Sequence, residues 1–204
     1  MSLITNADLN SISLDAEFRK SASASRNRTA GALLEELASS PGRTSFDVFL
    51  SHSYRDAQSL GANQLLRLKI LLERFGLSVY VDWMVDGDLD RNRVTTATAA
   101  RIRKRMDQSK CLMFATSASS SSSKWMPWEL GYKDGSSNRV AILPIVDQRK
   151  AKFFGQEYLG LYPYVTKQND TAGRTKLWLE LTDGRYVSFD EWLRTGRQPY
   201  KRAS

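Results

Sequence analysis

Four short, almost uninterrupted apolar runs in the middle of the chain constrain its fold most strongly. They are Phe46–Ser51 (FDVFLS), Leu77–Trp83 (LSVYVDW), Lys110–Thr116 (KCLMFAT) and Val140–Val146 (VAILPIV). Each run has the length of a strand, and apolar residues without polar alternation are typical of strands that are buried on both faces. Because helical patterns separate the runs, the sequence predicts an α/β fold with a central parallel sheet and helices on both faces.

The segments between these runs carry the helix signals. After the first run, leucines recur with helical spacing up to Phe75, and Gly76 is placed to end that helix. A basic helix is expected to run through Met106, and a further helix is expected over Trp125–Tyr132.

The two ends of the chain differ from the middle in composition and in the secondary structure that they predict. Residues 1–42 are polar and poor in aromatic residues, and we expect an N-terminal helical extension there with a boundary near Pro41. The central domain is expected over 43–166. Residues 167–204 are expected to form a hairpin that turns at Asp183-Gly184, then a short helix capped by Asp190 and a basic tail.

Composition excludes several classes of protein. With 41% hydrophobic and 25% charged residues, the chain is typical of a globular domain with a real core. Its longest apolar stretch falls far short of the ~20 residues that a membrane-spanning helix needs. The beginning of the chain lacks the pattern of a secretory signal, so a cytoplasmic location is expected. Because Cys111 and His52 are the only cysteine and histidine, no metal site built from several such ligands is expected.

The charge balance favours anionic partners. Lys and Arg number 30 against 22 for Asp and Glu, a formal net charge of +8, and one dense basic run lies within 91–105. For that run taken alone, a solvated helix face is the preferred interpretation.

Polar residues follow the first two apolar runs, where a parallel sheet places its ligand site. Ser51, His52 and Ser53 open a helix whose free N–H groups could face an anion, although plain N-capping explains them equally well. Asp82 could accept hydrogen bonds from ribose hydroxyls, and Trp83 could stack on a flat ring. An ordinary turn with a packing tryptophan is the alternative.

The segment after the third run is the most informative. A run of five serines that ends at Ser123 precedes Trp125, Pro127 and Glu129. It is better interpreted as a helix-capping turn than as a flexible linker, because Pro127 suits a first helical turn. Glu129 then lies near a helix N-terminus, which favours an ionised carboxylate. An acid among aromatics at this edge of a sheet is a candidate functional group, and a surface glutamate beside core tryptophans is the alternative.

In their order along the chain, these motifs resemble the Toll/interleukin-1 receptor (TIR) superfamily. The segments FDVFLSHSYRD, GLSVYVDW, SSSSSKWMPWELGY and VAILPI are more closely similar to bacterial TIR-like proteins of anti-phage defence, including the Thoeris type. The resemblance covers residues 44–165, and its most specific part is Ser-x-Trp-x-x-x-Glu-Leu. It departs from the family at Met126, where a cysteine is often found, and in the Ser-His-Ser sequence after the first strand.

The resemblance implies a flavodoxin-like TIR fold and cleavage of the nicotinamide–ribose bond of NAD, with a linear or cyclic ADP-ribose-derived signal as product. It implies that Glu129 is catalytic. The substrate-binding positions are expected to be Ser51, His52, Ser53, Asp82, Trp83, Ser123 and Trp125. NAD is the expected substrate, and no cofactor is expected. The expected partners are a second copy of the chain through TIR surfaces and a downstream effector that senses the product; neither a membrane nor nucleic acid is expected.

Two other functions are compatible with the sequence. A catalytically silent TIR-like adaptor would act by self-association, and nicotinamide release from NAD separates it from the enzyme. A nucleic-acid binder would explain the basic run, but its recognition motifs are absent from the sequence.

Overall fold

The computed structural model describes residues 2–14, 44–52, 61–82, 95–116, 123, 125–147 and 157–201. The described strands are β1 (Ile4–Thr5), β2 (Phe46–Ser51), β3 (Val79–Tyr80), β4 (Ser109–Thr116), β5 (Val140–Val146), β6 (Tyr164–Asn169), β7 (Thr175–Glu180) and β8 (Tyr186–Ser188). The described α-helices are α1 (Asn6–Asn10), α5 (Gly61–Arg74), α7 (Thr96–Asp107), α8 (Trp125–Ser137) and α9 (Phe189–Thr195), and a 3-10 helix spans Glu157–Leu161. None of these described helices is long and apolar enough to cross a membrane.

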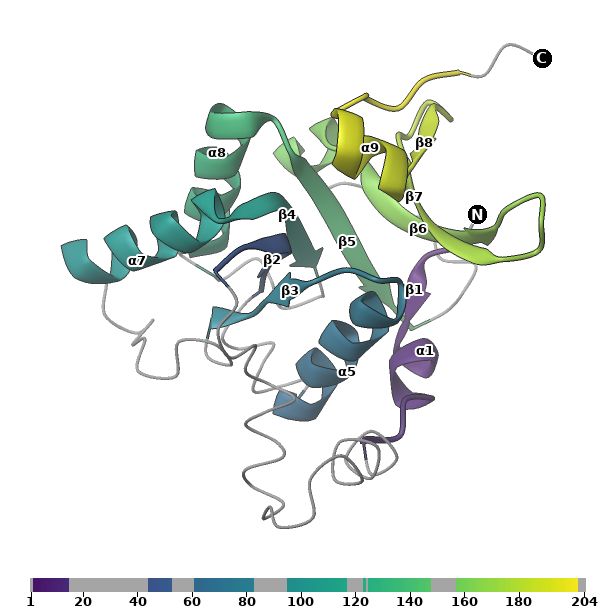
Figure 1. The fold of residues 1–204 in the computed structure, drawn as a ribbon, viewed down its shortest axis with the longest axis horizontal. Coiled ribbons are helices and arrows are strands. Elements are labelled where there is room, and N and C mark those ends of the chain that lie inside the picture. The colour runs from purple at the N-terminus through teal and green to yellow at the C-terminus, as the bar shows by residue number, and fades with distance from the viewer. Residues whose placement is uncertain are drawn as a thin grey trace.

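The strands form one sheet in the order β3-β2-β4-β5-β6-β7-β8, shown in Figure 1. From β3 to β6 every neighbouring pair is parallel. This is the strand order of flavodoxin-like folds, in which the first strand lies between the second and the third. The predicted parallel sheet is therefore confirmed, and its four predicted strands are β2 to β5. The fifth parallel strand, β6, was not identified from the sequence.

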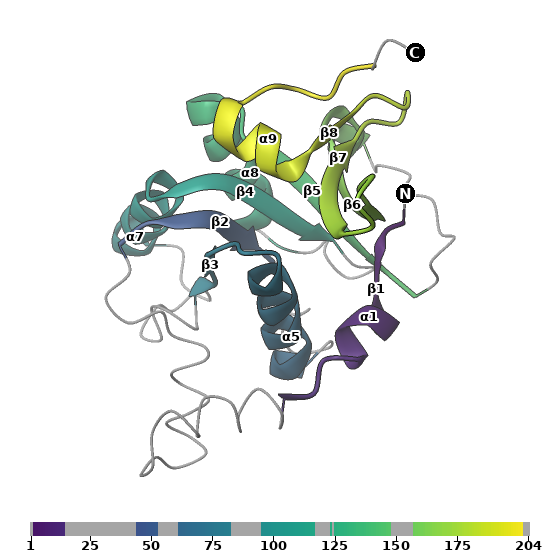
Figure 2. The same cartoon turned by 45° about the vertical axis from the view of Figure 1, so that its right-hand side comes forward.

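Helices cover both faces of this sheet, as predicted, and produce two hydrophobic cores (Figures 1 and 2). Successive residues of a strand point to opposite faces. In β4, Met113 therefore packs in the core that contains α5, whereas Phe114 packs in the core that contains α7 and α8. Gly76 follows α5 with a left-handed φ of 81°, which confirms its predicted place at the end of that helix.

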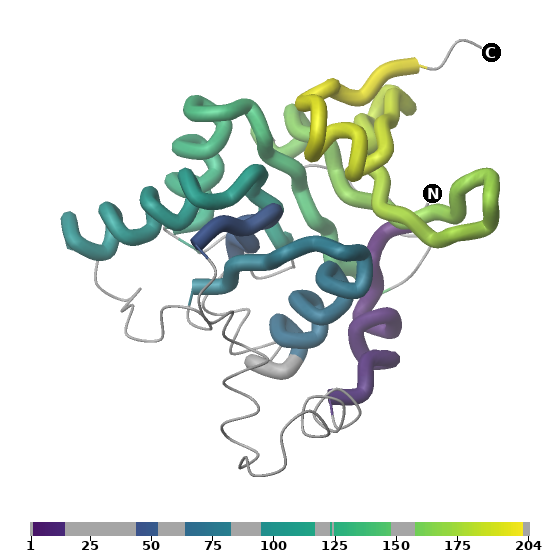
Figure 3. Tube along the Cα trace, in the orientation of Figure 1, coloured from purple at the N-terminus to yellow at the C-terminus, as the bar shows by residue number. Residues whose placement is uncertain are grey.

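The first residues of the chain belong to the sheet and its core. Strand β1 runs parallel to the last residues of β5, and Ser2 bridges to Lys167 of β6. Figure 3 traces this segment into α1, whose Leu9 is buried in the α5-side core. The expected boundary near Pro41 lies outside the described residues, and the division of the chain into three regions stays a prediction.

The C-terminal hairpin is confirmed. Strands β7 and β8 pair antiparallel, and Gly184 in their turn has a φ of 82°. The helix that follows is capped differently from the prediction. Its N-cap is Ser188, whose hydroxyl accepts a hydrogen bond from the N–H of Glu191, because the helix already begins one residue before Asp190. Asp190 instead lies in the first turn.

Candidate active site

The candidate site lies where the strand order reverses. The chain leaves β2 for β3 on one side and later returns to β4 on the other, and ligands in such folds bind outside the carboxyl ends of these strands. We call this side of the sheet the carboxyl edge and the opposite side the amino edge. Ser51 is the last residue of β2 and pairs with Phe114 near the end of β4. Glu129 lies on α8, the helix that follows β4.

Ser51 and Glu129 are joined by a short hydrogen bond. The Ser51 hydroxyl donates to Glu129 Oε2 at 2.5 Å, and both residues are fully buried, with 0% of their surface exposed. Ser51 follows Phe49 by two residues and so faces the α8 side of the sheet. A buried carboxylate requires polar partners, and a hydroxyl donor at this distance is typical of a charge-assisted bond. Glu129 is therefore an inward-facing acid, which excludes the alternative of a surface glutamate.

His52 and Asp82 form a second buried pair at the same edge. The Nδ1 atom of His52 lies 3.2 Å from the carbonyl oxygen of Leu50. Since a carbonyl oxygen only accepts hydrogen bonds, Nδ1 is the protonated nitrogen in this contact. The other ring nitrogen, Nε2, lies 3.6 Å from Asp82 Oδ1, a distance at which a protonated ring attracts the carboxylate. The last residue of β2, Ser51, thus faces one acid, and the residue after it, His52, faces another.

The start of α8 has the expected capping contact. The Ser123 hydroxyl accepts a hydrogen bond from the N–H of Met126 at 3.3 Å, which is the contact an N-cap side chain makes. Trp125 is buried in the core beneath α8, and its ring meets that of Trp128 edge-on with centroids 5.5 Å apart. Trp125 therefore packs against the sheet, and its expected contact with the substrate stays a prediction.

The structure brings together four of the residues selected from the sequence: Ser51, His52, Asp82 and Glu129. Ser53 and Trp83 lie outside the described residues. Sequence reasoning did not identify Lys133, a second buried ionisable residue on α8, although its spacing of four residues from Glu129 puts both on one helix face.

Lys133 has a structural role at the amino edge. Its ammonium donates to the carbonyl oxygens of Met106 at 2.9 Å and Ser109 at 2.6 Å. Burial lowers the pKa of Lys133. The two carbonyls lie at the end of α7 and the start of β4, so Lys133 fixes the junction between these elements.

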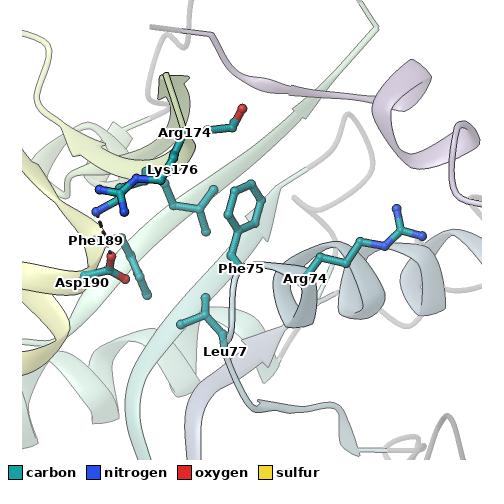
Figure 4. Close-up of a pocket in the computed structure, with 9 residues that line it drawn as sticks. Arg74, Phe75, Leu77, Arg174, Lys176, Phe189 and Asp190 are labelled. Carbon is teal, nitrogen blue, oxygen red and sulfur yellow. Dashed lines mark ion pairs between the residues drawn. The ribbon is translucent and has the colours of Figure 1, made fainter. Parts of the chain in front are cut away.

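A cavity of about 240 Å³ lies elsewhere, between the end of α5, the start of β7 and the start of α9 (Figure 4). Phe75 and Phe189 contribute to its wall, and Lys176 and Asp190 lie 3.8 Å apart at its rim. None of the four site residues lines this cavity. We therefore place the candidate site at the carboxyl edge, where the buried acids lie, and assign this cavity no part in the reaction.

Comparison with known proteins identifies the family of this chain. No family model matches the chain. The chain is 42% identical over 196 residues, which is 95% of its length and 98% of the relative, to a Bacillus cereus (strain MSX-D12) protein named "Probable 3' cyclic ADP-D-ribose synthase ThsB'". It is 34% identical over 88 residues, 43% of this chain and 22% of the relative, to TIR2 of Cytobacillus dafuensis, also named as a cyclic ADP-D-ribose synthase. With its flavodoxin-like strand order and near full-length similarity to the first relative, the chain belongs to the TIR superfamily, among the bacterial anti-phage proteins of the Thoeris type.

Proposed function

We propose that this chain is a TIR-type NAD nucleosidase that breaks the nicotinamide–ribose bond of NAD and closes the remaining ADP-ribose into a cyclic signal of anti-phage immunity. One observation carries this proposal: the buried carboxylate of Glu129 is held by Ser51 at the reversal point of the sheet. The names of both relatives, cyclic ADP-D-ribose synthases, support the same reaction for this chain.

The reaction suits a site with a single placed carboxylate. When the bond between ribose C1 and the nicotinamide nitrogen breaks, its electron pair returns to the cationic pyridinium ring, and neutral nicotinamide leaves. The leaving group therefore needs no general acid. The sugar passes through a state with oxocarbenium character, and a negative charge beside it lowers the barrier. Glu129 supplies this charge.

The second half of the reaction decides the product. Attack on C1 by water, with loss of one proton, gives linear ADP-ribose. Attack by a hydroxyl group of the same molecule, also with loss of one proton, gives a cyclic product without consuming water. The name of the nearly full-length relative supports the 3' cyclic isomer as the product here. No cofactor takes part in this proposal, since NAD is itself the substrate.

Product analysis tests this function directly. The purified protein is incubated with NAD, nicotinamide release is measured, and the remaining nucleotide is identified by mass spectrometry against linear and cyclic standards. The wild-type protein should release nicotinamide and form the cyclic product, and Glu129→Gln should form neither. If neither wild-type protein nor protein activated by infected-cell lysate releases nicotinamide, the chain is an adaptor that acts by self-association.

Assembly is a further part of the proposal. In the segment from Asp82 to Arg93, three acids after Trp83 (Asp86, Asp88 and Asp90) are followed by two arginines, the charge separation expected of a contact between subunits. A lone subunit would then rarely be competent, so nicotinamide release per molecule should rise with protein concentration. Charge reversal at Arg91 or Arg93 should reduce that rise. A flat dependence while light scattering shows only monomer contradicts assembly and leaves Glu129 untouched.

The proposed substrate and product also suggest a cellular compartment and a downstream partner. We place the reaction in the cytoplasm, where the NAD pool is available, and infer a downstream effector that binds the cyclic nucleotide.

A further inference from the structure

We propose that Ser51 is a positioning residue that holds the Glu129 carboxylate in its reactive orientation, instead of contacting the substrate itself. This inference rests on the proposed function and adds to it. It replaces the expectation from the sequence, in which Ser51 is a substrate-binding position.

The single hydrogen atom of the Ser51 hydroxyl is already used in the bond to Glu129. A serine hydroxyl has one hydrogen to donate, and in this structure it is donated to Glu129 Oε2 at 2.5 Å. No second donor remains on that side chain for a phosphate oxygen of NAD. The side chain points to the α8 side of the sheet, toward the helix that carries Glu129, because it follows Phe49 by two residues.

The backbone around Ser51 makes it a rigid anchor. Ser51 is paired with Phe114 of β4, in the middle of the parallel sheet, and the preceding Leu50 is buried in the α5-side core. Glu129 projects from a helix on a longer side chain with more rotatable bonds. A bond from the fixed strand to the longer side chain restricts the carboxylate, and a misplacement of about 1 Å at a reacting centre can reduce a rate by about 100-fold.

The same bond favours the ionised form of the acid. A hydroxyl that donates to a carboxylate stabilises its charge, and this matters most where burial opposes ionisation. Loss of the hydroxyl should therefore both misplace Glu129 and make it harder to ionise.

Ser51→Ala tests this role through kinetics. We expect kcat for nicotinamide release to fall by about 10- to 100-fold, the effect of losing a hydrogen bond to a charged group, while KM for NAD changes less than about twofold. The pH at which activity is half lost on the acid side should rise, because the variant no longer donates a hydrogen bond to the ionised carboxylate. Ser51→Cys keeps a similar shape with a weaker donor and should change kcat and the acid limb in the same direction by less.

Ser109→Ala is the matched control. Ser109 is also a buried serine of the sheet, and its hydroxyl donates to the Arg105 carbonyl oxygen at 2.8 Å, at the amino edge. This variant should lower the melting temperature while keeping the wild-type kcat and pH profile. An equal loss of kcat in both variants would show that a general loss of packing, and not the bond to Glu129, causes the effect, and would overturn the proposal.

A second background separates positioning from substrate contact. In Glu129→Gln protein, adding Ser51→Ala should leave the affinity for NAD unchanged, because the carboxylate through which Ser51 acts is already gone. A rise in KM with constant kcat, or a further loss of affinity in this background, would show that Ser51 touches NAD and would overturn the proposal. If Ser51→Ala does not fold, Ser51→Cys is the test. A Ser51→Cys protein with the wild-type kcat and pH profile would contradict the positioning role of Ser51. Full activity of Glu129→Gln alone would instead remove the proposed function.

Discussion

Both edges of the parallel sheet bury polar groups, but they use them differently. At the amino edge, the Asp47 carboxylate accepts hydrogen bonds from the N–H and the hydroxyl of Ser78 and from the ammonium of Lys110. These contacts join the starts of β2, β3 and β4. The buried ammonium of Lys133 likewise donates to one carbonyl oxygen at the end of α7 and one at the start of β4. Each of these polar groups ties neighbouring elements together.

At the carboxyl edge, two buried acids contact the polar residues at the end of a single strand, β2. Ser51 contacts Glu129 of α8, and the next residue, His52, lies beside Asp82, which follows β3. Helices that follow parallel strands begin at this edge, where free N–H groups favour negative charge, and they end at the amino edge, where carbonyl oxygens favour cations. The polarity of α8 therefore favours an acid such as Glu129 near its start and a cation such as Lys133 further along it. Asp47 is an acid at the amino edge, and its charge is compensated there by Ser78 and Lys110.

The largest expected effect is a difference in enzymatic activity between a substitution at the carboxyl edge and one at the amino edge. Glu129→Gln should reduce nicotinamide release by about 1,000-fold or more, because in the proposed function it removes the charge that stabilises the transition state, while it keeps the shape of the side chain. Asp47→Asn is the matched change at the amino edge and should retain turnover per folded molecule. Both are measured with purified protein at one NAD concentration, together with circular dichroism. A similar loss in both variants would mean that the edges do not differ in function.

Trp125→Ala sharpens the comparison, because Trp125 lies near the carboxyl edge but packs like a core residue. Removal of a buried tryptophan should cost about 3–5 kcal/mol of unfolding free energy and reduce activity at the same time. Thermal denaturation and nicotinamide release measure the two effects. An unchanged melting temperature with weaker NAD binding would instead make Trp125 a stacking residue for the substrate.

Asp47→Asn should have the smallest of these effects, on stability alone. Burial raises the pKa of Asp47, but hydrogen bonds from Lys110 and Ser78 outweigh it, so the pKa lies below its usual value of 3.8. A lowered pKa means that the carboxylate contributes stability above about pH 4 and loses it as the pH falls further. The variant should be about 1–3 kcal/mol less stable at neutral pH, and the difference should shrink in acid.

Urea denaturation from pH 7 to pH 3 measures this prediction. A difference between wild type and Asp47→Asn that stays constant down to pH 3 would show that the charge of Asp47 contributes nothing to the amino edge.

The fold was predictable wherever the signal was local. The apolar runs indicated β2 to β5, and the flavodoxin-like sheet and the TIR assignment are confirmed. Strand β6 was missed because four of its six residues, in the sequence YVTKQN, are polar. Strand β1 was missed because its two residues become a strand only by pairing with β5, far away in sequence. The cap of α9 was misplaced by two residues, since Ser188 and Asp190 are both good caps and only the start of the helix decides between them.

The candidate site divides in the same way. The sequence by itself determined which acids lie near the carboxyl edge, because motif, strand end and helix start are properties of neighbouring residues. It did not determine that Ser51 donates to Glu129, because the two residues are 78 positions apart. Strand register and the face on which α8 packs decide that contact. Tertiary structure likewise gave Lys133 its place at the amino edge, because a buried ammonium is stable only where folding brings carbonyl oxygens to it.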